Sequence, residues 1–287
     1  MAYITVTPVR NEQDYLPDLF QCMINQTIKP LVWVIVDDQS ADSTWMIIDN
    51  LQQNFSWIKG IKSDCKVNIG YAHERVTQST KRGIDYAITM CYKNNFEYDF
   101  ISVIDADVIL ENRYFEKIFE VFRKDNRLGI ASGMVYEPKL SLQQNLNMNS
   151  VPRGCALVFR KKCYEAIAGY HGHSNSLLKA NNRKWITKTV SSIKVVHRRE
   201  TGYNVKYFLA KGDYAHYINL HPLMALLMSV YFSKIYSPRK GLLYLIGYIK
   251  SFILKKQQID DDEIKECYWR SLNRALYRFN SLSSKNN

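Results

Sequence analysis

Two strand-like apolar runs, each ending in a pair of aspartates, constrain the fold of this chain more than any other feature. Leu31–Val36 is followed by Asp37-Asp38, and Phe100–Ile104 is followed by Asp105-Ala106-Asp107. Continuous apolar runs of this length are typical of strands buried on both faces of a parallel sheet. Ligands of such sheets bind outside the carboxyl ends of the strands. We therefore expect both acidic clusters at one ligand-binding edge.

Strand-like and helix-like segments alternate along the chain, which predicts an α/β fold with a mostly parallel central sheet and flanking helices. The expected strands are Tyr3–Val6 (stopping at Pro8), Leu31–Val36, Ile58–Ile61, Phe100–Ile104, Ile130–Tyr136, Cys155–Phe159 and Ile193–Val196. The expected helices open at Asn11-Glu12 and at Asp42 or Ser43, pass through Arg82–Ala87 after a polar loop Ser63–Tyr71, and begin again near Lys179.

The composition changes after Gly202, where large apolar and aromatic residues are interleaved with Lys and Arg. We expect one α/β domain at residues 1–202, a helical, basic and aromatic extension at 203–280, and a flexible tail at 281–287.

The net charge of +12 points to anionic partners, such as phosphorylated small molecules, phospholipid or nucleic acid. The six cysteines contain no C-x-x-C pair, and free thiols in a reducing compartment account for them most simply. No targeting signal precedes the first strand, and no run reaches the roughly 20 apolar residues of a membrane-spanning helix. We expect a cytoplasmic protein.

The acidic clusters have both a chemical and a plain structural interpretation. Asp105 and Asp107 suit Mg²⁺ or Mn²⁺, which prefer oxygen ligands and are often held by one or two carboxylates with substrate phosphates. Alternatively, one of them caps a helix and the other faces solvent. Asp38 is suited to accept hydrogen bonds from a nucleobase or a ribose, or else to form a turn.

At this point the sequence resembles glycosyltransferase family 2, with the GT-A (nucleotide-diphospho-sugar transferase) fold. The resemblance runs from Tyr3 to about Tyr170 and, less closely, to about Phe232. It rests on four motifs in the expected order, namely Thr7–Glu12, Val34–Thr44, Ile101–Asp107 and Arg153–Arg160 with Gly169-Tyr170 following.

The resemblance implies a donor site and a metal site. Pro8, Asn11, Asp38, Lys81 and Asp105 would bind the nucleotide, in a half of the domain at about 1–110, with Arg82 beside Lys81 in a looser match. Asp107, Asp105 and His197 would hold Mn²⁺ or Mg²⁺ on the diphosphate, and His197 is otherwise a simple strand-end histidine. Arg198, Arg199 or Lys211 would add positive charge beside the leaving group, or else each is a solvated surface charge. UDP is the expected nucleotide, and the acceptor half is expected at about 111–202.

One part of the family pattern is missing. Inverting members carry an Asp or Glu as general base just after the equivalent of Gly169-Tyr170, but no acidic residue lies between Ala166 and Arg199. We expect His171 or His173 to serve instead, since histidine titrates near neutrality. An acid from elsewhere, such as Glu137 or Asp213, or a mechanism without a protein base, are the alternatives.

The segment from Tyr214 to Lys256 combines short apolar runs with cations and tyrosines, a pattern that suits a helix lying in a membrane interface. We expect the protein at the inner face of the cell membrane, near a lipid-linked acceptor. The alternative is a helical bundle that packs on the core.

The predicted function is metal-dependent sugar transfer from a nucleotide-sugar to a saccharide or lipid-linked saccharide, in surface polysaccharide or glycoconjugate synthesis. A non-catalytic scaffold with the same fold is the alternative, because the acidic base is missing. A nucleic-acid-binding protein is disfavoured, because the basic residues are dispersed and no nucleic-acid motif is present.

Overall fold

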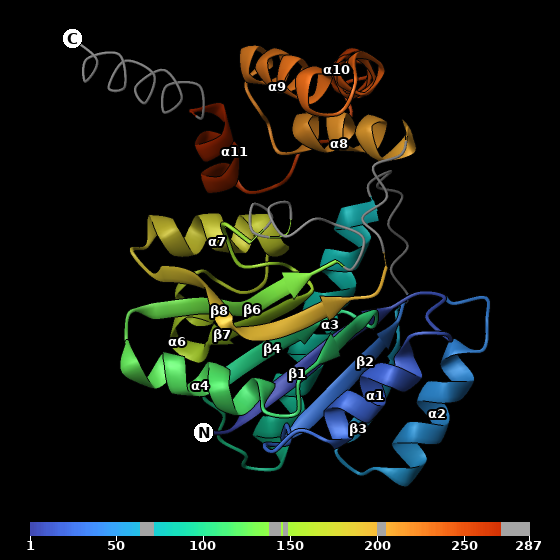
Figure 1. Ribbon diagram of the computed structural model, residues 1–287, viewed down its shortest axis with the longest axis vertical. Coiled ribbons are helices and arrows are strands. Elements are labelled where there is room, and N and C mark those ends of the chain that lie inside the picture. Colours follow the sequence, from blue (N-terminus) through green and yellow to red (C-terminus); the bar gives the residue numbers. More distant parts are fainter. Residues whose placement is uncertain (64–71, 138–144, 146–148, 200–204, 271–287) are drawn as a thin grey trace. The chain divides into compact units, whose positions relative to one another are not determined.

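The computed structural model describes residues 1–63, 72–137, 145, 149–199 and 205–270 (Figure 1). The chain divides into two compact units. The first comprises residues 1–68 and 72–200, and the second comprises residues 69–71 and 201–287. The predicted loop Ser63–Tyr71 beyond its first residue, the helical residues expected after 270 and the tail at 281–287 lie outside the described residues.

Within the described part of the first unit, eight strands form one sheet in the order β3-β2-β1-β4-β7-β6-β8-β5. The β3-β2-β1-β4 half is parallel, as the two acidic strand ends predicted, whereas β7 runs antiparallel to β4 and to β6, and β5 runs antiparallel to β8. The strands are β1 Tyr3–Val9, β2 Val32–Asp37, β3 Ile58–Lys62, β4 Phe100–Ile104, β5 Val108–Leu110, β6 Leu128–Tyr136, β7 Ala156–Arg160 and β8 Ile186–His197.

Strand β1 does not stop at Pro8, as the sequence suggested, but runs through it to Val9. Proline lacks a backbone N–H and is tolerated where a strand edge has no partner. Pairing of β1 with β4 ends at Val6, while pairing with β2 continues to Val9. Pro8 therefore lies where β1 is no longer paired on its β4 side, so its missing N–H leaves no ladder hydrogen bond unmade there.

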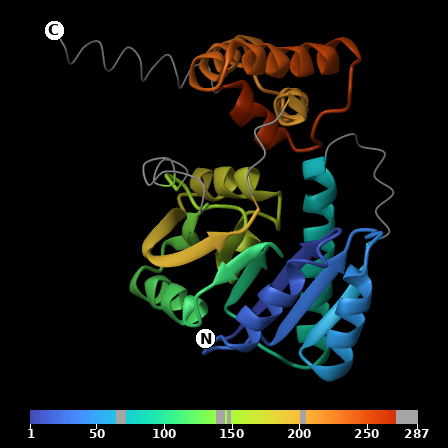
Figure 2. The same cartoon turned by 45° about the vertical axis from the view of Figure 1, so that its right-hand side comes forward.

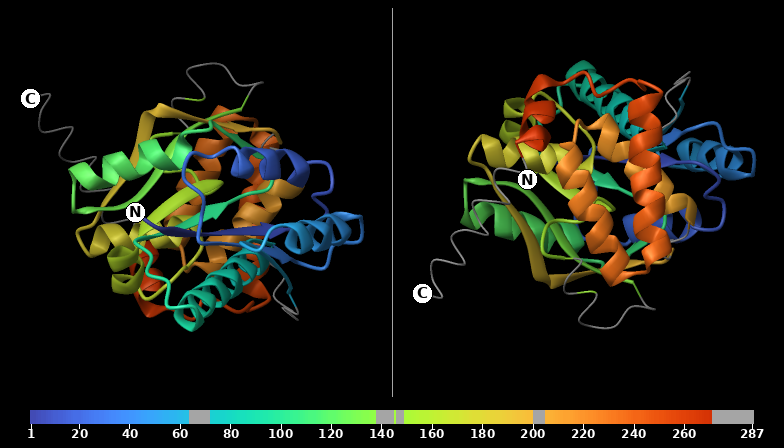
Figure 3. Two further views of the ribbon diagram at one scale, coloured as in Figure 1. Left: turned by 90° about the horizontal axis from the view of Figure 1, so that it is seen from below. Right: turned by 90° about the horizontal axis from the view of Figure 1, so that it is seen from above.

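Helices cover both faces of the sheet, so the strands near its centre, such as β2, β1, β4 and β7, are buried on both sides. On one face lie α1 Leu16–Ile24, α2 Thr44–Asn54 and α4 Tyr114–Lys124, and on the other lie α3 Ala72–Lys93, α6 Lys161–Ala166 and α7 His173–Asn182. Figure 3 shows α3 and α4 on opposite faces. Alternate residues of each strand belong to the two separate cores, such as Trp33 and Val34 of β2.

Helix α3 packs against β1 and β2 through Gly83. A Cβ at this position would lie 2.5 Å from Val6 Cγ1 and 2.6 Å from Val36 Cγ2. Only glycine therefore allows α3 to lie this close to the sheet. This packing holds the first turns of α3 beside the carboxyl ends of β1 and β2.

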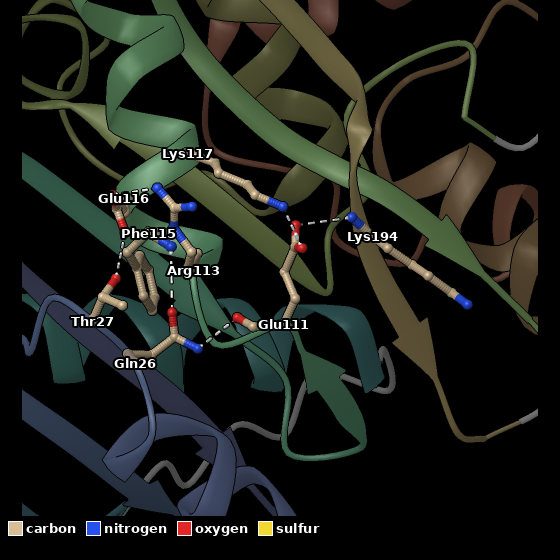
Figure 4. Close-up of polar contacts among 8 residues, drawn as sticks. All are labelled: Gln26, Thr27, Glu111, Arg113, Phe115, Glu116, Lys117 and Lys194. Atoms are coloured by element: carbon tan, nitrogen blue, oxygen red, sulfur yellow. Dashed lines mark hydrogen bonds and ion pairs between the residues drawn. The ribbon is translucent and has the colours of Figure 1, made fainter.

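A polar cluster fixes β5 and the start of α4 to the end of α1 (Figure 4). Gln26 Nε2 donates to the carbonyl of Glu111 at 2.8 Å, and Gln26 Oε1 accepts from the Phe115 amide at 3.4 Å. The Glu111 carboxylate accepts from Lys117 Nζ at 2.5 Å and from the Lys194 amide of β8 at 3.4 Å. These contacts fix Glu111, the residue that follows β5, and Asp107 directly precedes the same strand.

Several predicted boundaries were wrong. Helix α1 begins at Leu16 rather than at Asn11, because Asn11 has a φ of 55° and the residues after it form turns. The helix expected from Lys179 begins at His173, and the last strand begins at Ile186 rather than Ile193. Residues 186–192 are polar except for Ile186 and Val190, so they lack the continuous apolar signal of a buried strand.

The second unit is helical in its described part, with α8 Val205–Tyr217, α9 Pro222–Ile235, α10 Pro238–Ile253 and α11 Asp262–Trp269 (Figure 2). Proline at the first helical position and a capping side chain begin both α9 and α10. Helix α11 is capped by Asp261, whose Oδ1 accepts from the Ile264 amide. No helix in the described residues is long and apolar enough to cross a membrane.

The cysteines within the described residues form no disulfides, as expected. Cys65 lies outside those residues.

Candidate functional site

A cavity of about 340 Å³ opens at the carboxyl ends of β1, β2 and β4. Both acidic clusters reach it, as the strand order predicted. It is lined by Pro8, Val9, Arg10, Glu12, Asp38, Arg75, Val76, Ser79, Asp105, Ala106, Asp107 and Arg199. Three cations therefore face four carboxylates around one hollow, which suits a ligand that carries both negative charge and hydrogen-bond donors.

Asp38 forms the wall of the cavity after β2. Its amide donates to the Val9 carbonyl at 2.8 Å, which joins the ends of β1 and β2. Its Oδ2 lies 2.9 Å from Arg75 Nη2 and 3.9 Å from Arg10 Nη1. The buried Asp38 Oδ1 and Arg75 Nε have no hydrogen-bond partner. Unsatisfied buried polar atoms are costly, so this pair has bonding capacity left for a ligand.

Asp105 and Asp107 follow β4 at the centre of the sheet. The Asp105 amide donates to the Cys155 carbonyl at 2.9 Å, and the Asp107 carbonyl accepts from the Arg198 amide at 2.8 Å. Burial and the neighbouring Asp107 carboxylate raise the pKa of Asp105 to about 7. Burial also acts to raise the pKa of Asp107, but His197 and Arg199 outweigh it and hold that pKa below its usual value.

His197 stands between two carboxylates because of strand register. Its Nε2 is 3.4 Å from Asp107 Oδ1, and its Nδ1 is 3.7 Å from Glu137 Oε1. Val108 of β5 pairs with His197, while β6, which precedes Glu137, pairs with β8 up to Val196. Burial would lower the pKa of His197, but contact with Asp107 and the charges of Asp105 and Glu137 raise it above its usual value.

Glu137 is buried at 3 % exposure and is fixed from several sides. Its amide donates to Asn145 Oδ1 at 2.9 Å, and Asn145 Nδ2 donates back to its carbonyl at 3.3 Å. Arg153 Nη2 lies 3.6 Å from its carboxylate. The backbone is therefore held like a paired strand, which keeps the carboxylate against His197.

Arg199 crosses the mouth of the site. Its Nη2 donates to Glu12 at 2.6 Å, its Nε lies 3.5 Å from Asp107, and its guanidinium carbon lies 4.8 Å from the centre of the Tyr15 ring. Burial raises the pKa of Glu12 in spite of Arg199. The guanidinium is thus tethered beside Asp107 while it remains accessible from solvent.

Asp105, Asp107 and His197 are side chains of the types that bind a divalent cation. In their present positions, however, no group of three acidic, histidine or cysteine side chains in the described residues could enclose a metal. Two carboxylates with phosphate oxygens are nevertheless a common arrangement for Mg²⁺. The His197 Nδ1, buried and without a hydrogen-bond partner, lies on the side of the ring toward Glu137, so Nε2 faces Asp107.

The two candidate base histidines lie outside the cavity lining. His171 Nε2 is 2.8 Å from the Ile167 carbonyl, and His173 Nε2 is 2.6 Å from the Pro152 carbonyl. These contacts require Nε2 to carry the proton, so Nδ1 is the basic nitrogen in each neutral ring. The His173 ring packs on Gly154. The next residue, Cys155, accepts a hydrogen bond from the Asp105 amide through its carbonyl.

The other predicted residues have different surroundings. Asn11 is exposed, and its Oδ1 accepts from the Ala41 amide at 2.8 Å, which joins two loops near the cavity. Lys81 and Arg82 are exposed on α3 and do not line the cavity, whereas Pro8 does. In the helical unit, Asp213 accepts from Ser251 at 2.5 Å, and Lys211 donates to the Tyr207 hydroxyl at 3.2 Å.

Sequence reasoning missed Arg75, Arg10 and Glu12 as cavity residues. Arg75, Val76 and Ser79 occupy one face of α3 at i, i+1 and i+4 spacing, and this face points to the cavity. The sequence signal for this face was a small polar residue, Ser79, one helical turn after Arg75 near the start of the helix. Glu12 ends the quoted Thr7–Glu12 motif, but its pairing with Arg199 is visible only in three dimensions.

Comparison with known proteins gives a family match over most of the chain. Residues 5–185 match the family Glycosyl transferase family 2. The chain is similar in structure to a mannosyltransferase from Pyrobaculum calidifontis in complex with GDP-Man and Mn²⁺, with a TM-score of 0.59, 12% identity, and 89% and 88% of the two chains covered. It is also similar to TarS 1–349 of S. aureus in complex with UDP, with a TM-score of 0.50, 11% identity, and 88% and 72% covered. Comparison with curated protein sequences gave no match.

Proposed function

This chain belongs to glycosyl transferase family 2 and has the GT-A glycosyltransferase fold, and from that premise we propose that it transfers a sugar from a UDP-sugar to a saccharide or lipid-linked saccharide with the help of a divalent cation. The observation that carries this proposal is the single cavity reached by Asp38, Asp105 and Asp107 from the ends of neighbouring strands. A mannosyltransferase and TarS, two proteins with a similar fold, are described in complexes with GDP-Man and UDP.

The nucleobase would bind against the Asp38–Arg75 pair. The unpartnered Asp38 Oδ1 is a buried acceptor, and a uracil imide offers a matching N–H donor. Arg75 Nε is an unpartnered donor beside it, and uracil has carbonyl acceptors next to its imide. Pro8 and Val76 supply apolar walls to the same cavity. This pairing of donor and acceptor supports a uridine nucleotide.

The diphosphate would lie over Asp105, Asp107 and His197, with Mn²⁺ or Mg²⁺ held by the two aspartates and the histidine. When bound, the cation stabilises the negative charge that develops on the nucleoside diphosphate leaving group. Arg199 is tethered next to Asp107 by Glu12 and lies where it can add a second positive charge.

Glu137 would act as a positioning residue for His197. Histidines that bind metals usually donate their other N–H to a carboxylate or carbonyl, which fixes the ring and its tautomer. Glu137 lies 3.7 Å from His197 Nδ1 and is itself held by Arg153 and Asn145. Its carboxylate is therefore placed to keep Nε2 directed at the diphosphate.

Deprotonation of the acceptor hydroxyl would fall to His173, with His171 as the second candidate. His173 is the first residue of α7. Its Nε2 donates to the Pro152 carbonyl, so Nδ1 is the basic nitrogen of the neutral ring. Its contact with Gly154 brings the ring next to the strand end that supports Asp105.

We further propose that residues 1–202 form the catalytic domain and that the enzyme works in the cytoplasm at the inner face of the cell membrane, in surface polysaccharide or glycoconjugate synthesis. The net charge of +12 supports contact with an anionic surface.

The test of the base pocket is a UDP titration in the presence of Mn²⁺ with the variants Asp38→Ala, Arg75→Met and Lys81→Met. Asp38→Ala should weaken binding by roughly 10- to 100-fold, since a hydrogen bond to a charged group contributes about 1.5–3 kcal/mol. Arg75→Met should weaken it too, and comparison with Lys81→Met decides which cation contacts the nucleotide.

Arg123→Met, an exposed cation on α4, is the matched control. If Asp38→Ala remains folded by circular dichroism and binds UDP as tightly as the wild type, the proposed base pocket is wrong.

A further inference from the structure

Helices α9 and α10 of the second unit carry many large apolar side chains on the outside. On α9 these are Leu223, Leu226, Leu227, Val230 and Tyr231, and on α10 they are Leu242, Ile246, Ile249 and Ile253, each 43–70 % exposed. Spacing of three and four residues places each set on one face of its helix. We call these nine residues the outer stripe.

The inward faces of the same helices combine buried aromatic rings, Phe232, Tyr244 and Tyr248, with glycines at the points of closest approach. A Cβ at Gly247 would lie 2.2 Å from the Leu209 carbonyl oxygen, and one at Gly241 would lie 2.3 Å from the Ser229 carbonyl oxygen. A Cβ at Gly212 of α8 would lie 1.9 Å from the Tyr244 carbonyl oxygen. The helices therefore pack backbone to backbone, as Figure 3 shows for α9 and α10 lying side by side.

An apolar outer face on each helix departs from the pattern of a water-soluble bundle, in which the outer face is polar. Glycines that allow close approach, together with an apolar exterior that meets acyl chains, are features of helices that pack in lipid. Helices of 14 and 16 residues are too short to span a bilayer. They are long enough to lie in the plane of its surface.

The charge of this region is nearly all of one sign. Asp213 is the one acidic residue between 205 and 258, and its carboxylate is used inside the unit by Ser251 and by Lys256 at 3.4 Å. The cations in the same stretch are Lys206, Lys211, Lys234, Arg239, Lys240, Lys250, Lys255 and Lys256. An anionic surface matches them, whereas a second copy of this basic region would repel them.

Basic residues also interrupt or border the outer stripe. Lys250 lies among Ile246, Ile249, Ile253 and Leu254 in a hollow of about 460 Å³ that is otherwise apolar. A long cationic side chain beside an apolar hollow suits a lipid, whose phosphate would meet the ammonium and whose acyl chain would fill the hollow.

We infer that the outer stripe of α9 and α10 lies in the interface of an anionic bilayer, with its apolar side chains at the acyl boundary and the lysines at the lipid phosphates. This assigns the membrane contact to nine named residues and to anionic lipid. It does not depend on the nucleotide site, which can be measured separately in every variant.

The test is flotation of the full chain with phosphatidylcholine vesicles, with and without phosphatidylglycerol. We expect binding to the anionic vesicles and at least tenfold weaker binding to the neutral ones. The triple variant Leu227→Ser, Ile246→Ser, Ile253→Ser should bind anionic vesicles at least tenfold more weakly than wild type. Lys250→Gln with Lys255→Gln should weaken binding to the anionic vesicles only.

The matched control is Met46→Ser, Tyr92→Ser, Phe96→Ser, which removes three exposed apolar side chains from the first unit. It should bind vesicles as the wild type does. Retained UDP binding and an unchanged circular dichroism spectrum establish that the outer-stripe variant is folded.

Three results would overturn the inference. The first is failure of the wild type to bind anionic vesicles, and the second is equal binding by the outer-stripe variant. The third is a wild-type dimer in sedimentation velocity that the outer-stripe substitutions convert to monomer, since a second copy would then cover this face.

Discussion

Helices α4 and α10 both bury aromatic rings but differ in what their exposed faces carry. In α4 the buried face carries Tyr114, Phe115, Ile118, Phe119 and Phe122, and the exposed face carries charges such as Glu120, Arg123 and Lys124. In α10 the buried face carries Tyr244 and Tyr248 with Gly241, Gly247 and Ser251, and the exposed face carries leucine and isoleucine.

The difference teaches that an apolar stripe at helical spacing does not by itself say which way a helix faces. An apolar face of either helix is stabilised when it is covered from water. For α4 the sheet provides that cover, and for α10 we propose that lipid does. The sequence offered two interpretations of the extension, a helical bundle that packs on the core and a helix in a membrane interface. They are compatible, because one face of a helix can pack within the protein while the opposite face contacts lipid.

The largest expected change in the free energy of unfolding follows the loss of a buried aromatic ring. Phe119→Ala removes a side chain that stacks on Phe100 with ring centres 4.6 Å apart, and it should lower the free energy of unfolding by about 3–5 kcal/mol. Ile246→Ser, on the outer stripe, should change it by no more than about 0.5 kcal/mol in water. Urea unfolding followed by circular dichroism measures both. Equal losses would mean that the α10 stripe is covered within the protein.

A smaller effect is expected from the inward glycines of α10. Gly247→Ala introduces a Cβ against backbone atoms that cannot rotate away, and overpacking of this kind costs about 1–3 kcal/mol. Ile249→Ala, two residues along on the exposed face, serves as the control and should be near neutral. If Gly247→Ala were neutral as well, close backbone packing would not hold this unit together.

The smallest expected effect separates the two units by pH. The pKa of His197 is raised, so in metal-free protein its contribution to stability is present below about pH 6.5 and is lost as pH rises through its folded pKa. The pKa of His216 in α8 is lowered by burial and by Lys256, so its contribution is present above about pH 6.5 and is lost as pH falls.

Proton NMR of the imidazole signals, assigned with His197→Gln and His216→Gln, should give midpoints on opposite sides of pH 6.5. Midpoints on the same side would contradict the electrostatic difference between the two environments.

The sequence could predict the features that local pattern determines. The apolar runs before Asp38 and Asp105 identified β2 and β4, and buried parallel strands place their carboxyl ends at one edge. Asp38, Asp105 and Asp107 were accordingly brought to one cavity. The resemblance to family 2 glycosyltransferases was confirmed over residues 5–185.

The features that pairing between distant segments creates could not be predicted. Strand β5 has three residues and exists because β8 pairs with it, 85 residues or more along the chain. The same pairing brings His197 between Asp107 and Glu137. Arg75 reaches Asp38 because Gly83 lets α3 lie close to the sheet, and neither fact has a local signature.

The central claim is that the cavity is a metal-dependent nucleotide-sugar site, and one calorimetric titration tests it most directly. UDP, GDP and dTDP are titrated into wild-type protein and Asp107→Ala, each with and without Mn²⁺, with Glu120→Ala, an exposed carboxylate on α4, as the control. The account predicts tight binding of UDP only with Mn²⁺, weakened by about 100-fold or more in Asp107→Ala, in line with the loss of one key group of a charged site. Absence of binding of any of the three nucleotides to folded protein with Mn²⁺ present would contradict it.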